Sequence, residues 1–285
     1  MAVAAAIALL VVASILFHLL SPWWMTPIAS NWGSIDNALI ITLYICAIAF
    51  VGLNLFLALA LMKYRARPGH KAHYEPENSR LEKRLTLWTG IGIAAMLAPG
   101  LIAWHEYVTV PEDAAVIEAT GQQWQWSYRF PGADGVLGSA AVSHISADNP
   151  FGLNPADPFG RDDILVETSE LHMPIGKPVK MVLRSKDVLH DFYVPQFRAK
   201  MDLVPGIVTY FWMTPTRIGT YDILCAELCG VGHHMMRGSV VVEDQQSFDD
   251  WLSGQMTYGQ YLAQNHAAAR TRLASADVAG PNGGQ

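Results

Sequence analysis

Residues 225–236 read Cys225-Ala226-Glu227-Leu228-Cys229-Gly230-Val231-Gly232-His233-His234-Met235-Met236. They hold two thiols, two imidazoles, one carboxylate and two thioethers. Thiolate, imidazole and thioether are the donors that suit copper, because thioethers bind hard, oxygen-seeking ions poorly and zinc seldom recruits them. The motif therefore predicts a copper redox centre, and the rest of the chain indicates where that centre works.

Two segments are long and apolar enough to cross a membrane. The chain of 285 residues is 51% hydrophobic and only 15% charged, which is too apolar for an ordinary soluble domain. Residues 38–62 and 86–104 carry no charged side chain and match the roughly 20 residues that a bilayer core requires. We expect residues 38–107 to form a transmembrane helical hairpin, with a kink at Pro99 and Gly100.

Residues 1–20 form a further uncharged apolar stretch. A signal peptide would begin with Lys or Arg and end at a small-residue cleavage site, but no Lys or Arg precedes Lys63 and the stretch runs into Ser21-Pro22-Trp23-Trp24. A third span with tryptophans at the membrane interface fits this pattern better. Residues 1–37 are therefore expected to hold an extra transmembrane helix, or a signal anchor, followed by an external linker.

The distribution of basic residues predicts the orientation. The loop 63–84 between the two spans has seven basic and three acidic residues, which indicates a cytoplasmic loop by the positive-inside rule. The chain from residue 108 onward would then lie outside, and it has 12 basic and 20 acidic residues. We expect a multi-pass protein of the bacterial inner membrane, embedded in the lipid bilayer. Its external domain is acidic, which does not favour nucleic acid as a partner.

Cysteine usage favours metal binding over a disulfide. Cys46 lies inside a predicted span, where it would act as a small apolar residue. A bridge between Cys225 and Cys229 would close too small a loop to add much stability, and it would leave His233 and Met236 unexplained.

The external part has the pattern of a small β-domain. Short alternating runs are separated by turn residues, which is typical of a sandwich or barrel. We predict a membrane-anchored all-β protein whose residues 108–253 form a cupredoxin-like antiparallel β-domain, with an irregular loop over 131–161, a short helix over 247–252 and a disordered tail over 254–285. The predicted strands are 116–120, 123–130, 163–167, 178–184, 207–212, 219–224 and 238–242.

The copper motif lacks one imidazole. In sites of this kind, one histidine comes from a distant part of the sheet. His190 follows a predicted strand, is flanked by apolar and aromatic residues, and precedes Cys225 by 35 residues. It is our candidate for the missing ligand.

The sequence resembles subunit II of the haem-copper cytochrome c oxidases over most of its length. The spacing of Cys225, Cys229, His233 and Met236 is similar to that of the family's dinuclear copper centre, CuA, whereas a mononuclear blue-copper site needs a single cysteine. The resemblance implies bridging thiolates, His190 and His233 as imidazole ligands, Met236 as a weak thioether ligand and the carbonyl of Glu227 as another. His234 and Met235 compete for the same roles, and we interpret them as packing or surface residues.

Residues 121–128 resemble the family's aromatic strand. There, a tryptophan on the docking face passes the electron from cytochrome c to copper, and that role falls on Trp124. An aromatic core residue is the alternative, which fits Trp126 and Tyr128 better. The family usually has an aromatic residue between the two tryptophans, where this chain has Gln125.

The resemblance also implies contacts with partners. Residues 200–206 resemble the segment that contacts the catalytic subunit I, where the carboxylate of Glu227 would help to hold magnesium. Many members carry a glutamate for proton uptake where this chain has Leu85, and Glu82 is one helical turn away. An acidic face suits a basic donor protein by electrostatic steering. Asp187 matches a docking acid of the family, and the other candidates are Asp162, Asp163, Glu167 and Glu170.

These features predict an electron-transfer subunit of a respiratory oxidase. It would accept electrons from cytochrome c at CuA and pass them to haem in subunit I, where oxygen becomes water, so that it is catalytic only within its complex. A quinol oxidase subunit would lack Cys225 and Cys229. A CuA subunit of a nitric oxide reductase remains an alternative, and an anchored zinc-binding or copper-chaperone module is another, although zinc would leave Met236 unused.

Overall fold

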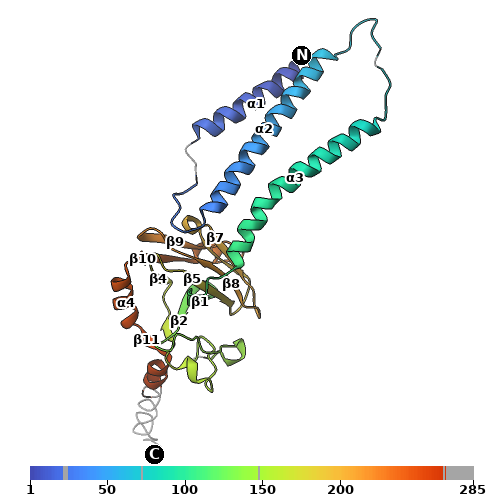
Figure 1. Cartoon of the computed structure of the whole chain (residues 1–285). Coiled ribbons are helices and arrows are strands. Elements are labelled where there is room, and N and C mark those ends of the chain that lie inside the picture. The colour runs from blue at the N-terminus through green and yellow to red at the C-terminus, as the bar shows by residue number, and fades with distance from the viewer. Residues whose placement is uncertain (22–24, 72, 147, 266, 268–285) are drawn as a thin grey trace, which may run out of the picture. The chain divides into compact units, whose positions relative to one another are not determined.

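The computed structural model describes residues 1–21, 25–71, 73–146, 148–265 and 267, which fall into two compact units. The first unit contains Met1–Pro27 and Gly33–Glu106, and the second contains Ile28–Trp32 and the chain from Tyr107 onward. Figure 1 shows the long helices of the first unit in blue to green and the strands of the second in green to orange.

Three apolar helices make up the first unit. They are α1 (Ala2–Leu20), α2 (Gly33–Lys63) and α3 (Ser79–Val108), and each is long and apolar enough to cross a membrane. The two predicted spans lie inside α2 and α3, and residues 1–20 form α1 as expected. Helix α1 packs against α2, with Ala4, Val11 and Ala58 buried. Trp23 and Trp24, the predicted interfacial residues, lie outside the described residues.

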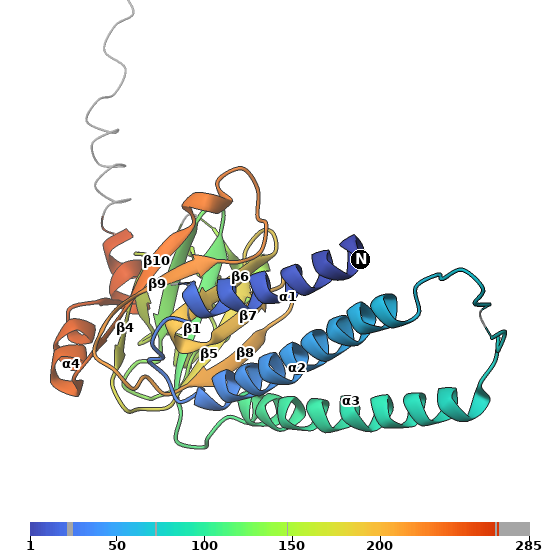
Figure 2. The ribbon, with the colours of Figure 1, turned by 90° about the horizontal axis from the view of Figure 1, so that it is seen from above.

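Two β-sheets make up the core of the second unit, and they confirm the predicted sandwich class. In the described residues, two strand pairs, β1 with β5 and β4 with β10, are parallel, so the sheets are mixed rather than purely antiparallel. Figure 2 shows the strands from above. One sheet has the order β11 (Met256–Thr257), β3 (Ile164–Val166), β2 (Gln125–Phe130), β1 (Ala115–Gln122), β5 (Val179–Ser185) and β8 (Thr209–Met213). The other has the order β4 (Glu170–Pro174), β10 (Arg237–Glu243), β9 (Gly219–Cys225), β6 (His190–Val194) and β7 (Ala199–Leu203).

Each of the seven predicted strands overlaps an observed one. The strands that the sequence pattern did not reveal are β4, β6, β7 and the two-residue β11. The described residues of the loop 131–161 are irregular as expected, apart from two short 3₁₀ turns at Val142–His144 and Pro158–Gly160 and two isolated β-bridges, Ala140 with Leu153 and Ser146 with Asn149.

Aromatic side chains from both sheets fill the space between them. The ring centroids of Trp126 on β2 and Phe192 on β6 are 5.5 Å apart, and those of Phe192 and Phe211 on β8 are 6.1 Å apart. All three side chains are fully buried, as is Tyr128. The interpretation of Trp126 and Tyr128 as core residues is therefore confirmed.

A buried ion cluster lies on the six-stranded sheet. The Arg129 guanidinium on β2 donates to both Glu118 carboxylate oxygens, at 3.1 and 2.9 Å, and also to Asp163. Arg184 Nε donates to the same Glu118 at 2.7 Å. Because Asp163 is fully buried, it offers no surface charge, and the prediction that it docks a partner is wrong. Its sequence neighbourhood is acidic, but the pairing with Arg129 holds it inside.

The C-terminal part of the described chain is ordered further than expected. Asp244 caps α4 (Gln245–Ser253) by accepting from the backbone N–H of Ser247, and the predicted helix 247–252 lies inside α4. The prediction of a disordered tail from residue 254 is wrong for its first part, because β11 pairs with β3 and Tyr258 is buried. Residues 266 and 268–285 lie outside the described residues.

Residues 28–32 of the linker between α1 and α2 are part of the β-domain. Ser30 forms a β-bridge with Pro215, and the indole of Trp32 donates to the carbonyl of Trp212 at 3.0 Å. The buried Trp32 ring lies 5.1 Å from that of Tyr107 and 4.9 Å from that of Trp212. The sequence placed these residues outside the domain, whose expected start was residue 108. The domain therefore draws on residues 28–32 and Tyr107 for its core.

A substitution at Arg129 tests how much the buried ion cluster contributes to stability. Replacing Arg129 with Met would leave Glu118 and Asp163 buried without their main cation. We expect the free energy of unfolding to fall by about 3–5 kcal/mol, as for other broken buried ion pairs. Chemical denaturation of the full chain in detergent measures this. The matched change Arg217→Met, at an exposed arginine, is expected to cost less than about 0.5 kcal/mol. Equal losses of stability in Arg129→Met and Arg217→Met would contradict the assignment of Arg129 as the main cation of the buried ion cluster.

Trp32 tests the role of the linker. Trp32→Ala removes a buried aromatic side chain and its hydrogen bond, and we expect a loss of about 3–5 kcal/mol in the stability of the β-domain. Thermal unfolding followed by circular dichroism measures it. Met25→Ala, at an exposed position of the same linker, serves as the control and is expected to leave the melting temperature unchanged.

Candidate metal centre

The predicted metal motif forms the loop that joins two paired strands. Strand β9 ends at Cys225 and β10 begins at Arg237, with Leu224 opposite Arg237 in the antiparallel register. The backbone N–H of Cys225 donates to the carbonyl of Met236 at 3.2 Å, which closes the base of the loop. A 3₁₀ turn at His233–Met235 lies inside it. The loop therefore starts and ends on rigid strands.

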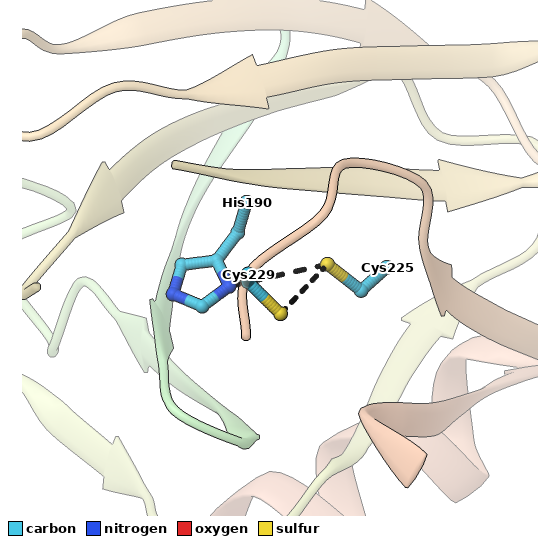
Figure 3. A group of neighbouring side chains, drawn as sticks. All are labelled: His190, Cys225 and Cys229. Atoms are coloured by element: carbon cyan, nitrogen blue, oxygen red, sulfur yellow. Dashed lines mark hydrogen bonds between the residues drawn. The ribbon is translucent and has the colours of Figure 1, made fainter. Parts of the chain in front are cut away.

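His190 reaches this loop from β6. Strand β6 pairs with β9 so that Phe192 lies opposite Cys225, which brings His190 next to the cysteines. The ligand atoms of His190, Cys225 and Cys229 all lie within 4.8 Å of one another, and Figure 3 shows the imidazole directed at the two sulfurs. A Cβ at Gly121 would lie 3.1 Å from the His190 ring, so glycine leaves room for the imidazole. Strand pairing thus brings together residues 35 positions apart.

The donor atoms form two similar halves around the sulfur pair. Cys225 Sγ and Cys229 Sγ lie 3.7 Å apart. On one side, Cys225 Sγ is 3.9 Å from His190 Nδ1 and 3.2 Å from the carbonyl oxygen of Glu227. On the other side, Cys229 Sγ is 3.6 Å from His233 Nδ1 and 3.8 Å from Met236 Sδ. Each sulfur therefore has one imidazole and one weaker donor beside it.

Burial separates the two candidate methionines and the two candidate histidines. Met236 is 1% exposed, whereas Met235 is 65% exposed. His233 is half-buried beside Cys229, whereas His234 is exposed. Met236 and His233, at the predicted ligand positions, therefore lie beside the cysteine sulfurs, whereas Met235 and His234 are exposed to solvent.

The two thiols differ in acidity. Burial raises the pKa of Cys225, but hydrogen bonds with His190 and with the backbone of Asp191 and Glu227 outweigh it and lower the pKa to about 6. Burial and the neighbouring Cys225 raise the pKa of Cys229 to about 11. Of the two thiols, that of Cys225 loses its proton more readily, and a bound cation would favour the loss of the second proton by compensating its charge.

Asp187 supports His190 from behind. Its carboxylate lies 2.8 Å from His190 Nε2 and accepts from the backbone N–H of Gln123 at 2.7 Å. Burial raises the pKa of Asp187, but the hydrogen bonds with Gln123 and His190 are stronger and lower it overall. A carboxylate on one ring nitrogen leaves the other free for a metal, an arrangement common around metal-binding histidines. The docking role expected for Asp187 stays a prediction.

Trp124 lies against the metal loop and also reaches the surface. Its indole Nε1 donates to the carbonyl of Cys229 at 3.2 Å, and 36% of the residue is exposed. A Cβ at Gly232 would come within 2.3 Å of the indole ring, so only glycine fits beneath it. Gln125, the departure from the family pattern, is exposed.

The remaining candidate acids are partly engaged in contacts of their own. Asp162 is half-buried and accepts from the backbone N–H of Asp134 at 3.2 Å. Glu170 is about half exposed and lies 3.1 Å from His172 Nε2. Glu167 is exposed. Of the five candidate docking acids, these three and Asp187 have some surface exposure.

The sequence reasoning missed Gln123. Its side-chain amide donates to the carbonyl of Cys229 at 2.9 Å, next to the bond from Trp124. No spacing rule marks a glutamine as part of a metal site, so its only signal was its position directly before Trp124.

Comparison with known proteins gives concordant matches. A family model described as "Cytochrome C oxidase subunit II, periplasmic domain" matches residues 115–244. The alternative cytochrome c oxidase subunit 2 of Bradyrhizobium diazoefficiens is 54% identical over 277 residues, which cover 97% of this chain and all of the relative. Cytochrome c oxidase subunit 2 of Thermostichus vulcanus is 30% identical over 242 residues, covering 76% of this chain and 73% of the relative.

Solved structures give matches of low overall similarity. The periplasmic domain of subunit II of cytochrome oxidase from Bradyrhizobium japonicum is 27% identical and covers 51% of this chain and 95% of that one, with a TM-score of 0.38. Because this score is low, the assignment rests on the sequence matches. The chain therefore belongs to the cytochrome c oxidase subunit II family, and it is a membrane-anchored subunit of a haem-copper oxidoreductase complex.

Proposed function

We propose that this chain holds a dinuclear CuA centre and transfers electrons from cytochrome c to the haem of subunit I, where oxygen is reduced to water. The ligands would be the side chains of His190, Cys225, Cys229, His233 and Met236, with the carbonyl of Glu227. Residues 108–253 would be the copper domain, on the periplasmic side of the bacterial inner membrane.

The observation that carries this proposal is the doubled donor set. Each of the two sulfurs has its own imidazole nitrogen within 4 Å and its own weaker donor, a carbonyl on one side and a thioether on the other. A single metal ion would leave one of these halves unused. Two ions that share the sulfurs would use both, and such a centre supplies one-electron redox chemistry.

The donor chemistry fits copper better than zinc. Met236 is fully buried and its Sδ lies 3.8 Å from Cys229 Sγ, so a thioether is one of the donors at the site. Zinc sites are built from thiolate, imidazole and carboxylate, and a thioether has no use there. The burial of His190, Cys229 and Met236 also keeps water from the ligands, so that solvent rearranges little when the charge changes.

Trp124 is the proposed point of electron transfer from the donor protein. Among the described residues, Trp124 is the aromatic residue that both reaches the surface and hydrogen-bonds to a cysteine of the loop. The excess of acidic residues from 108 onward suits a basic donor such as cytochrome c. Glu167, Glu170 and Asp162 remain candidate docking acids, with Asp187 held between His190 and Gln123.

Membership of the oxidase family favours oxygen over nitric oxide as the final electron acceptor. Magnesium at the carboxylate of Glu227 stays a prediction. Where the family usually carries the proton-uptake glutamate, this chain has Leu85, and Glu82 is either its substitute or an ordinary interfacial charge.

Copper loading tests the proposal directly. The copper-loaded full chain is expected to bind two copper ions and to give an electron paramagnetic resonance spectrum with hyperfine structure from one electron shared equally over two coppers. Metal analysis and spectroscopy on one sample measure both. One copper per chain, a mononuclear spectrum or a preference for zinc would reject the dinuclear assignment.

The adjacent histidines provide a matched test of the ligand set. His233→Asn removes the imidazole that lies 3.6 Å from Cys229, and we expect loss of one copper or collapse of the shared-electron spectrum. His234→Asn is the same chemical change at the exposed neighbour, so the spectrum should stay that of the wild type. If His234→Asn lost copper and His233→Asn kept the wild-type spectrum, His234 and not His233 would be the ligand.

A further inference from the structure

Gln123 contacts three parts of the candidate electron-transfer site. Its side-chain Nε2 donates to the carbonyl of Cys229 at 2.9 Å, and its backbone N–H donates to Asp187 at 2.7 Å. Asp187 in turn lies 2.8 Å from His190 Nε2. Trp124 is the next residue in the chain. Gln123 therefore connects Trp124 with a cysteine and, through Asp187, with a histidine of the proposed centre.

We propose that Gln123 is a positioning residue that holds Trp124 at a fixed distance from the metal loop during electron transfer. This inference rests on the proposed function, because electron transfer through Trp124 depends on the distance that Gln123 would keep fixed. The role belongs to the side-chain amide, whereas Trp124 itself carries the electron.

The carbonyl of Cys229 is the point where the two residues meet. Trp124 Nε1 donates to this oxygen at 3.2 Å, and the Gln123 amide donates to it at 2.9 Å. A carbonyl oxygen has two lone pairs and accepts both. Without the amide, the Cys229 carbonyl would keep only the longer of the two bonds, the one from Trp124, and the loop could move relative to the indole.

The loop is shaped to admit this contact. Gly230 has a backbone φ of +114°, a conformation that side-chain-bearing residues rarely adopt. A Cβ there would lie 3.0 Å from Gln123 Nε2 and 3.4 Å from the Trp124 ring. Glycine at 230 thus lets the amide and the indole approach the loop together. With Gly232 beneath the indole, both glycines of the loop serve this contact.

The backbone bond to Asp187 extends the connection to the other half of the site. Asp187 accepts from Gln123 with one oxygen and contacts His190 with the other. The segment before Trp124 is therefore fixed to the β9–β10 loop through the Gln123 amide and to His190 of β6 through Asp187. The backbone contact survives substitution, so a side-chain variant tests the amide alone.

The test compares Gln123→Met with Gln125→Met in the purified oxidase complex. Both changes replace an amide with an apolar side chain of similar length at an exposed position, but of the two glutamines it is Gln123 whose side chain donates to the metal loop. We expect Gln123→Met to slow copper reduction at saturating reduced cytochrome c about tenfold, on the scale of one lost hydrogen bond. The cytochrome concentration for half-saturation, the copper content and the paramagnetic resonance spectrum should not change. Gln123→Glu, which has the same shape but no donor as a carboxylate, should show the same loss of rate.

A second readout uses the copper-free full chain. Hydrogen–deuterium exchange of the loop 226–232 should be faster in Gln123→Met than in Gln125→Met, because the amide no longer holds the Cys229 carbonyl.

The outcomes separate this inference from the proposed function. The positioning role would be overturned by an unchanged rate in Gln123→Met or by an equal loss of rate in both variants. Loss of copper from Gln123→Met would also overturn it, because Gln123 would then be needed to build the metal site. A wild-type chain without a dinuclear spectrum would reject the proposed function, and the exchange measurement would still decide whether Gln123 holds the loop.

Discussion

The pairing of β6 with β9 is the constraint on which the site depends. It puts Phe192 opposite Cys225 and so brings His190 to cysteines that lie more than thirty residues further along the chain. Strand β10 then pairs with β9 and fixes where the loop returns, which puts Met236 beside Cys229. Six donors reach one small volume because three neighbouring strands share one sheet. The opposite sheet contributes Trp126 to the core and Trp124 to the loop surface.

The sequence was informative wherever chemistry required unusual residues close together. The loop donors and His190 could be predicted because thiols, imidazoles and thioethers are rare and their spacing is distinctive. Strands β1, β2, β3, β5 and β8 of the six-stranded sheet and β9 and β10 of the other sheet were visible as alternating runs bounded by turn residues. Strands β4 and β7 alternate polar and apolar residues but contain no β-branched or aromatic residue, the types enriched in strands, and β6 begins with the polar pair His190 and Asp191, so the pattern did not mark these three strands.

Other features depend on tertiary pairing that composition does not encode. Asp163 resembles any surface acid until Arg129, on another strand, is brought against it. Residues 28–32 resemble a linker until Trp32 is seen between Tyr107 and Trp212. Gln123 is an ordinary polar residue until the Cys229 carbonyl is placed beside it. In each case, the partner comes from elsewhere in the chain, so no local window contains the signal.

The incorporation of Ile28–Trp32 into the β-domain has a consequence for biogenesis. This segment leaves the ribosome before any strand of the domain, and its partner Trp212 follows 180 residues later. Helices α2 and α3 lie between this segment and the strands along the chain, so the segment and the strands reach the same side of a membrane only when both helices cross it. A chain in which only one of the two helices crosses would lack this piece of its core. Completion of the β-domain core thus depends on the insertion of both helices.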